Sequence, residues 1–478
     1  MVRKKKKFYI TTSIAYANAP AHIGFAQEVI QADVLARYHR LLGEDTFFLT
    51  GTDEHGGKVA KAAEEIGKSP KEFVDEISDK FRALKEILNL SNDDFIRTTD
   101  KKRHWPSVKK VWLKLKENGD IYKKKYRGLY CVGCEAFVKE KDLVGGKCPV
   151  HEKIPEVIEE ENYFFRLSKY QDQLKTIIEA EKLKIIPETR KNELLSFINQ
   201  GLEDTSCSRS REKLEWGILV PDDKTQSVYV WLEALVNYLS ALDYATNGDK
   251  FKKFWSPDIH CIGKDIFIRF HGSLWPAMLL SLKLELPKTI FVHGFVTVGG
   301  QKMSKSLGNV VDPFELVKKY GTDAVRYFLL REIPPTEDGD FTYQKFEQRY
   351  NADLASGLGN LVARVMKMAE KKVTKPSSQM AIKPRIDKTL RNYKRALDEF
   401  KFNTALISIW ELISFCDRYI EKERPWEKSE RQLSIINNLL FAIANIAEML
   451  RPFLPETSER IFRQIKNKKS EILFPRLK

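Results

Sequence analysis

The chain has 478 residues, of which 42% are hydrophobic, 11% aromatic and 31% charged, proportions that are typical of a folded globular protein and exclude an intrinsically disordered chain. No uninterrupted apolar run reaches the roughly 18 residues of a membrane span, so we expect no membrane partner. The 81 lysines and arginines exceed the 66 aspartates and glutamates by 15. This basic excess favours a polyanionic partner, although on charge alone a solubility surface explains it equally well.

The first hundred residues alternate between strand and helix patterns. Residues 8–14 (FYITTSI) are predicted as a strand, and residues 15–24 (AYANAPAHIG) as a loop that contains proline and glycine. Residues 25–43 have helical spacing and end at a glycine, and residues 44–57 (EDTFFLTGTDEHGG) form a second strand with a polar loop. Strand, loop, helix and strand in this order open a parallel α/β sheet.

Later segments divide the rest of the chain. The alternation stops between 117 and 220, which is predicted to be an insertion with its own small fold, and resumes over 221–340 with SVYVWLEALVNYLSAL and TIFVHGFVTV. From 341 to 478 apolar residues recur at spacings of three and four, which indicates a helical bundle. The fold class is therefore α/β, a Rossmann-type doubly wound parallel sheet in two halves (1–116 and 221–340), with an insertion and a C-terminal all-α bundle.

Four residues in the insertion have the spacing of a zinc site. Cys131 and Cys134 form one close pair, and after thirteen residues Cys148 and His151 form a second. Two such pairs can complete a tetrahedron around one Zn²⁺, and because protein fills all four positions we expect a structural site. The chain has only six cysteines, which argues against a disulfide scaffold and for a reducing compartment, so we expect a cytoplasmic protein.

Two loops contain residues suited to phosphate. His22 and Gly24 lie after the first strand and before the first helix, where a doubly wound sheet binds its ligand and a helix N-terminus favours an anion. Residues 302–306 (KMSKS) follow a late strand and can hold a triphosphate, because a lysine is a mobile positive charge. Each loop alone is also explained as an ordinary structural or surface loop.

Together the two loops resemble a known pair of signatures. HIGF at 22–25 and KMSKS at 302–306 are similar to the signatures of class I aminoacyl-tRNA synthetases. Further segments extend the resemblance to the methionyl-tRNA synthetase family over almost the whole chain; they include GTDEHG, VYVWLEALVNYL, VHGFVTVGGQKMSKSLGN, YGTDAVRYFL and NADLASGLGNLVAR. The resemblance implies a methionine–tRNA ligase, which activates L-methionine with ATP and transfers it to the 3'-terminal ribose of its tRNA.

The resemblance also implies the residues of the active site. A methionine pocket would be lined by Ile14, Tyr16, Asp53, Trp231, Ala234, Tyr238 and His271. Aromatic rings suit a polarizable thioether, and Asp53 would receive the substrate ammonium. ATP, with Mg²⁺, would be bound by His22, Gly24, Glu28, His293, Gly294 and Lys305, and catalysis would rest on His22, Lys302 and Lys305.

The helical segment would bind tRNA. The resemblance matches Asn360, Arg364 and Trp426 to the residues that read the anticodon, and amides, guanidinium groups and indole rings suit splayed-out bases. Partners would be the initiator and elongator tRNAs for methionine, ATP and L-methionine. The chain ends just past the helical pattern, so we expect a monomer.

The chain departs from the family pattern at three places. Phe25 stands at the fourth signature position, where histidine is usual, and Glu233 stands where aspartate is expected. The spacing from Lys264 to His271 is one residue longer than expected. The alternatives are another class I synthetase, a nucleotidylyltransferase, or an inactive relative that only binds RNA.

Overall fold

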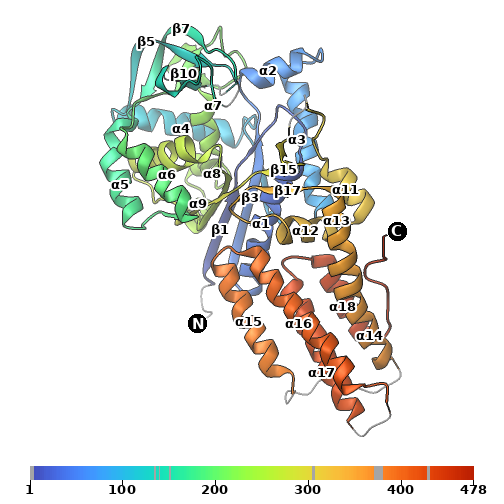
Figure 1. Ribbon diagram of the computed structural model, residues 1–478. Helices are drawn as coiled ribbons and strands as arrows, with labels where there is room; N and C mark the ends of the chain where they lie inside the picture. Colours follow the sequence, from blue (N-terminus) through green and yellow to red (C-terminus); the bar gives the residue numbers. More distant parts are fainter. Residues whose placement is uncertain are drawn as a thin grey trace. The chain divides into compact units, whose positions relative to one another are not determined.

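The computed structural model describes residues 5–133, 136–138, 140–149, 152–303, 307–370, 381–427 and 431–477 (Figure 1). Its internal contacts divide the chain into two compact units, each made of segments that are distant in sequence. Unit 1 comprises Met1–Ala21, Gly43–Ala83 and Asn92–Val292, and unit 2 comprises His22–Leu42, Leu84–Ser91 and His293–Lys478.

A seven-stranded sheet forms the centre of unit 1. Its strands are β2 (Ala15–Tyr16), β3 (Asp45–Asp53), β1 (Lys7–Thr12), β13 (Ile259–Gly263), β14 (Thr289–His293) and β8 (Lys184–Ile186) in spatial order, with β4 (Asp94–Arg97) also paired to β3. The pairings of β1 with β3 and β13, of β3 with β2 and β4, and of β14 with β8 are parallel. Helical crossovers bury both faces of such a sheet, which explains why β1 is buried from its second residue onward. The predicted parallel α/β fold is confirmed.

Helices of unit 1 pack apolar faces into one core. Helix α4 (His104–Glu117) buries Val108, Val111, Trp112 and Leu115, a spacing of three and four residues that places them on one face. The other helices of this unit are α2 (Gly57–Glu64), α3 (Pro70–Ile87), α5 (Gln171–Glu179), α6 (Glu188–Asn199), α7 (Val230–Leu235), α8 (Asn237–Ser240), α9 (Asp249–Phe254), the π-helix η4 (Phe267–Leu274) and α10 (Trp275–Ser281).

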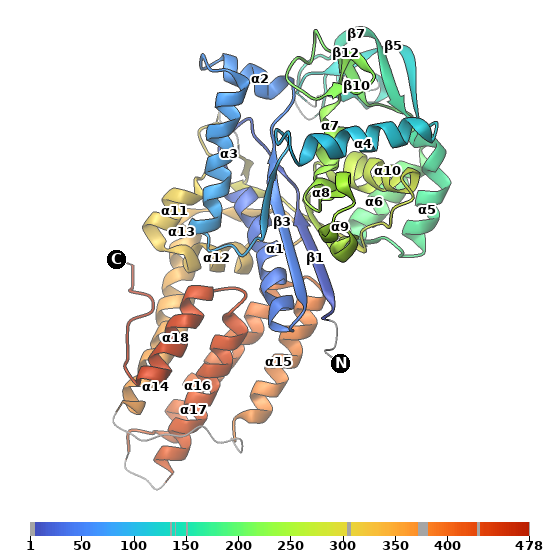
Figure 2. The same cartoon turned by 180° about the vertical axis from the view of Figure 1, so that it is seen from behind.

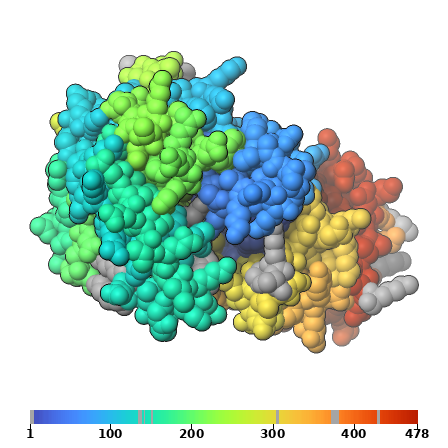
Figure 3. Space-filling view, turned by 90° about the horizontal axis from the view of Figure 1, so that it is seen from above, coloured from blue at the N-terminus to red at the C-terminus, as the bar shows by residue number. Residues whose placement is uncertain are grey.

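The segment predicted as an insertion forms two small antiparallel sheets together with β12, a strand that follows the predicted boundary at 220. One pairs β5 (Ile121–Cys131) with β6 (Ala136–Val138) and β7 (Glu156–Phe165), and β7 with β9 (Thr205–Ser206). The other is formed by β10 (Ser208–Ser210), β12 (Asp223–Val228) and β11 (Leu219–Val220). Figure 2 shows β5, β7, β10 and β12 together, and Figure 3 shows the surface of this region in teal and green. Strand β8, however, lies within 117–220 and joins the central parallel sheet.

Unit 2 contains helix α1 (Ile23–Leu41) and nearly all the chain after 292. Its strands are β15 (Val296–Val298), β16 (Gln301–Lys302) and β17 (Gly339–Phe341). Its helices after α1 are α11 (Pro313–Tyr320), α12 (Thr322–Arg331), α13 (Tyr343–Arg349), the π-helix η6 (Tyr350–Gly359), α14 (Asn360–Ala369), α15 (Lys383–Asp398), α16 (Phe402–Glu423), α17 (Gln432–Leu450) and α18 (Pro455–Asn467). Figure 1 shows α15, α16 and α17 side by side, and the predicted C-terminal helical region is confirmed.

A buried ion pair ties α1 to the helices of unit 2. The Arg326 guanidinium on α12 lies 2.8 Å from Asp33 on α1, and both side chains are fully buried. Arg326 also donates to the backbone carbonyls of Leu88, Pro452 and Phe453 at 2.7 to 3.0 Å. A buried charge is costly unless it is paired and hydrogen-bonded, so these four acceptors fix how α1 and α12 pack.

Among the described residues, α17 alone is long and apolar enough to cross a membrane by length and composition, with a mean hydropathy of 1.6. Its most apolar window is 56% buried inside the protein. The core helix of a bundle has the same properties, so this is weak support for a membrane span.

Candidate functional site

Two residues predicted to bind the amino acid are neighbours on adjacent strands of unit 1. Tyr16 on β2 stands opposite Asp53, the last residue of β3, and the Ala17 N–H donates to the Asp53 carbonyl at 2.8 Å. Asp53 lies at the carboxyl end of its strand and is only 5% exposed. The carboxyl ends of parallel strands are where open α/β sheets bind ligands. Ile14, in the same loop, packs against the core.

An aromatic wall lies beside this pair. Tyr16 and Trp231 pack against the same small cluster of Leu214, Tyr229 and Val230. Trp231 is stacked on Phe270, with ring centres 3.9 Å apart and planes inclined by 11°. Ala234, one turn further along α7, is buried. The sequence does not predict Phe270 as a methionine-binding residue, because no motif or spacing around it indicates that role.

Tyr238 and His271 are a contacting pair among the residues predicted to bind methionine. The Tyr238 hydroxyl lies 2.7 Å from His271 Nε2, and both side chains are buried. Burial lowers the pKa of His271 to about 4, so this imidazole is neutral at physiological pH. His260 packs against the Tyr238 ring at 4.3 Å, and burial also lowers its pKa well below the ordinary range. The two imidazoles therefore add no charge beside the Tyr238 ring at physiological pH.

The segment that carries His271, where the sequence suggested a longer spacing than the family pattern, is a π-helix. Residues Phe267–Leu274 form a π-helix, and the His271 N–H donates to the Ile266 carbonyl, five residues back, at 3.3 Å. A π-turn holds one residue more than an α-turn, so an extra residue can be absorbed there without displacing its flanks. The π-helix brings His271 to Tyr238 despite the longer spacing.

Glu233, which stands where the family pattern predicts aspartate, is a buried carboxylate between two histidines. Glu233 Oε1 lies 3.0 Å from His55 Nδ1 and 2.9 Å from His104 Nε2, and Glu233 and His104 are completely buried. Burial by itself would raise the pKa of Glu233, but the two imidazoles outweigh it and lower the pKa well below the usual value. The sequence marks neither histidine as a partner, because they are distant from Glu233 along the chain.

In unit 2, His22 and Gly24 are joined at the start of α1. His22 is the N-cap, and its Nδ1 accepts a hydrogen bond from the Gly24 N–H at 3.0 Å. A neutral imidazole that accepts at Nδ1 carries its proton on Nε2 and donates there. A Cβ at position 24 would lie 2.8 Å from the His22 ring, so glycine permits this contact. Phe25 is half-buried in the same turn.

Glu28 and His293 form a buried pair in unit 2, with Glu28 Oε2 2.8 Å from His293 Nε2. His293 Nδ1 lies 2.8 Å from the Gly294 carbonyl. A Cβ on Gly294 would lie 2.1 Å from the backbone of Glu337, so the fold itself requires glycine here, whatever the site binds.

The lysine-rich loop starts from a tight hairpin. Strands β15 and β16 are joined by Gly299 and Gly300, whose φ angles of 60° and 76° are those of a type I′ hairpin turn. Lys302 ends β16, and its ammonium lies 4.9 Å from the centre of the Phe295 ring. Lys305 lies outside the described residues.

Two of the four predicted zinc ligands come together in unit 1. Cys131, at the end of β5, and Cys148 are buried cysteines in one small cluster with Val138. Cys134 and His151 lie outside the described residues. Within the ranges that the structure describes, no group of three or more candidate ligands is placed to hold a metal ion.

Residues predicted to read the anticodon lie in the helical part of unit 2. Asn360 and Arg364 are one turn apart on α14, and Asn360 is exposed. Arg364 donates to Glu421 at 2.6 Å and lies 3.7 Å from Asp417 on α16. Trp426 follows the end of α16 and is 52% exposed.

Comparisons with known proteins extend over almost the whole chain. The family model "tRNA synthetases class I (M)" matches residues 8–153 and 138–366, and the model "Anticodon-binding domain of tRNA ligase" matches residues 381–476. The methionine–tRNA ligases of Thermotoga maritima and Caldanaerobacter subterraneus are each 45% identical to the chain; the matches cover 96% and 99% of this chain and 75% and 79% of those proteins. The solved structure of Mycobacterium tuberculosis methionyl-tRNA synthetase in complex with methionyl-adenylate superposes with a TM-score of 0.91 at 39% identity, and the match covers 97% of this chain and 95% of that one.

Proposed function

Since this chain belongs to the methionyl-tRNA synthetase family of class I, we propose that unit 1 binds L-methionine and that unit 2 supplies the ATP-binding signatures and the tRNA-binding helices. The enzyme activates L-methionine with ATP to methionyl-adenylate and pyrophosphate, and then transfers methionine to the terminal ribose of its tRNA. The observation that carries this function is the 45% identity to methionine–tRNA ligases over nearly the full chain.

The methionine side chain would lie against the aromatic wall. The Trp231–Phe270 stack and the Tyr238 ring are polarizable apolar surfaces, which suit a thioether. The neutral state of His271, which its lowered pKa ensures, keeps the pocket uncharged where an apolar side chain must displace water. Asp53 would pair with the substrate ammonium, a charge-assisted contact that fixes the amino acid at its other end.

Adenylation needs positioning and charge stabilisation more than proton transfer. The methionine carboxylate is already an anion and attacks the α-phosphorus in line, so no general base is needed. His22 would donate from Nε2 to a phosphate oxygen, while Lys302 and Lys305 neutralise the charge that moves onto pyrophosphate. Glu28, His293, Gly24 and Gly294 would bind the nucleotide, and Mg²⁺ would enter with ATP.

The tRNA would contact the helical part of unit 2. An exposed indole such as Trp426 can stack on a base, and the Arg364 guanidinium is oriented by two carboxylates on α16. Those carboxylates would repel a phosphate, so we assign Arg364 to hydrogen bonds with a base edge rather than to the backbone.

A structural zinc site in the insertion completes the proposal. The placement of the buried Cys131 and Cys148 in one small cluster supports it, since the sequence places the second member of each predicted ligand pair within three residues. Three thiolates and an imidazole are a typical tetrahedral zinc set, which would hold the ends of β5 and the following loop together. Metal analysis should find about one zinc per chain, and a disulfide between any two of these cysteines would contradict the proposal.

An ATP–pyrophosphate exchange assay across all twenty amino acids tests the function. Exchange that depends on methionine alone is the expected result. Exchange with another amino acid would indicate a different class I synthetase. Absence of exchange, with tRNA binding retained, would indicate an inactive RNA-binding relative.

A further inference from the structure

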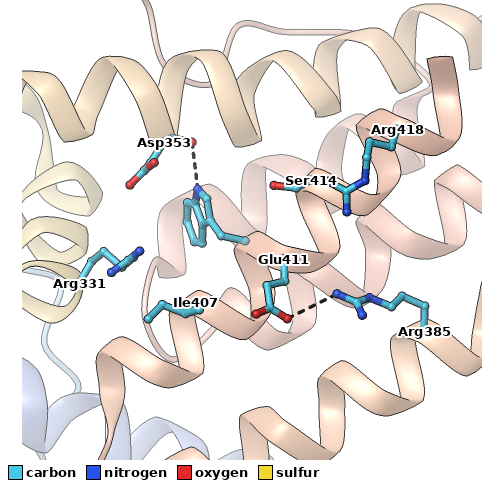
Figure 4. A pocket seen from close by; sticks show the side chains of 8 residues that line it. Arg331, Asp353, Arg385, Ile407, Glu411, Ser414 and Arg418 are labelled. Atoms are coloured by element: carbon cyan, nitrogen blue, oxygen red, sulfur yellow. Dashed lines mark hydrogen bonds and ion pairs between the residues drawn. The ribbon is translucent and has the colours of Figure 1, made fainter.

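The helical part of unit 2 contains a cavity of about 510 Å³ that none of the predicted residues lines (Figure 4). Four elements surround it: α12, η6, α15 and α16. Its lining residues are Arg331, Asp353, Arg385, Ile407, Trp410, Glu411, Ser414 and Arg418. The five that come from α16 fall at positions i, i+3, i+4, i+7 and i+11 and so lie on one face of that helix.

The cavity has a positive balance of charge. Three arginines face two carboxylates, and Asp353 already accepts hydrogen bonds from the Tyr327 hydroxyl at 2.8 Å and from Arg349 at 3.2 Å. Glu411 accepts one long bond of 3.4 Å from Arg385 Nη2. The arginines are therefore only partly neutralised by the carboxylates that line the cavity.

Two of the guanidinium groups have buried donors that the described residues do not satisfy. The Nε atoms of Arg331 and Arg385 are both buried, and neither has a hydrogen-bond partner within the described part of the chain. A buried donor without a partner is destabilising, and more so when the group is charged. An anionic oxygen in the cavity would remove this cost, and a planar guanidinium binds phosphate with two parallel bonds.

One wall of the cavity is a fixed aromatic ring. Trp410 donates from Nε1 to the Asp353 carbonyl at 3.3 Å, and its ring packs 4.6 Å from that of Tyr327. On the same helix, Glu411, Ser414 and Arg418 are exposed, so a ligand can reach the cavity from solvent. The cavity is therefore open to solvent on the side of these three residues.

We propose that this cavity receives a backbone phosphate of the bound tRNA, an inference that rests on the proposed function. Helix α16 would then present two different surfaces to the RNA. Asp417 and Glu421 surround Arg364 with negative charge, which suits a base edge. The 407–418 face instead lines a cavity in which its own Arg418 is joined by Arg331 from α12 and Arg385 from α15, and this set suits a phosphate.

The test compares arginines that differ only in their position. Arg418→Gln and Arg385→Gln each remove one charge from the cavity, and the control Arg391→Gln removes one charge from an exposed position of α15 outside it. We expect each cavity variant to bind methionine tRNA about tenfold more weakly. The slope of the logarithm of the binding constant against the logarithm of the salt concentration should also fall by about 1 in magnitude, while Arg391→Gln changes neither quantity. Methionine-dependent pyrophosphate exchange, which needs no tRNA, checks that each variant is folded.

Three outcomes would overturn the proposal. One is a loss of tRNA affinity in Arg391→Gln that equals the loss in the cavity variants. It would indicate a general electrostatic attraction rather than a binding site. Another is normal tRNA binding by Arg418→Gln, an exposed position that folding does not require. The third is inorganic phosphate binding that Arg385→Gln abolishes without any effect on tRNA, which would indicate a small-anion site. If the unaltered protein charges tRNA with methionine, the proposed function stands whatever the cavity variants show.

Discussion

The residues assigned to methionine and those assigned to the anticodon differ in how the protein holds them. In unit 1 the side chains touch one another: Trp231 stacks on Phe270, and the Tyr238 hydroxyl contacts His271 at 2.7 Å, with Tyr238 and His271 buried. In unit 2 Asn360 is exposed, Trp426 is 52% exposed, and helical register alone brings Asn360 and Arg364 together.

This contrast follows from the two ligands. A small apolar side chain gains free energy from a preformed, dry pocket, whereas an RNA base must be met by rings and polar groups that protrude into solvent. Substitutions in or near the methionine site should therefore alter catalysis or stability. Substitutions of the residues assigned to the anticodon should alter tRNA affinity alone. Four variants test this difference.

The largest effect is expected from Lys305→Ala, which removes a charge that serves the transition state. We expect the adenylation rate to fall by about 100- to 1,000-fold, with a much smaller change in methionine affinity. Pyrophosphate exchange at saturating methionine measures the rate, and Lys318→Ala on α11 is the control for loss of an unrelated lysine. Unchanged turnover with a raised methionine KM would contradict a role of Lys305 in the transition state. It would also weaken the contrast between the active site and the anticodon-binding residues.

Glu233→Gln should destabilise unit 1, because it removes the charge that the His55 and His104 imidazoles face. We expect a loss of about 3 kcal/mol in the free energy of unfolding at pH 7, measured by chemical denaturation. The exposed Glu212→Gln is the control, with an expected change near zero.

The pH dependence of Glu233→Gln has a definite sign. The folded-state pKa of Glu233 lies below its unfolded value of about 4.3, so its contribution is complete above that pH and is lost as the pH falls through the folded pKa. The difference between the two proteins should therefore shrink below about pH 4. A difference that stays constant down to pH 3 would mean that the carboxylate acts by shape and not by charge.

Trp426→Ala should weaken tRNA binding by about 1–3 kcal/mol, the value of one lost base stack, and leave methionine-dependent exchange intact. Leu433→Ala truncates another exposed apolar side chain of unit 2, at 48% exposure, and should leave both measurements unchanged. Equal damage to exchange and to tRNA binding would make Trp426 a packing residue and remove the contrast.

The smallest effect is expected from Phe25→His, which restores the usual signature residue. The reaction needs no proton transfer, and water can replace one missing donor, so the ATP KM and the exchange rate should change by no more than about threefold. An inactive protein that this substitution activates would show that the unaltered chain is only an RNA-binding relative.

The sequence by itself determined the family, the parallel sheet, the helical region and the function. HIGF and KMSKS are 280 residues apart, and their joint presence is specific because each motif carries chemistry in its own few residues. Local patterns of this kind are readable because neighbouring residues in sequence remain neighbours in space. The same is true of Gly299 and Gly300, whose positive φ angles are a property of one turn.

The features that depend on contacts between residues far apart in the sequence were decided only by the tertiary structure. It shows that His271 lies in a π-helix in contact with Tyr238, that Glu233 bridges two histidines from elsewhere in the chain, and that β8 belongs to the central sheet. It also shows that the Arg326–Asp33 pair fixes α1 within unit 2, and that three arginines from three helices share one cavity. Such contacts are set by packing and by the pairing of buried charges across long sequence separations, which no local pattern encodes.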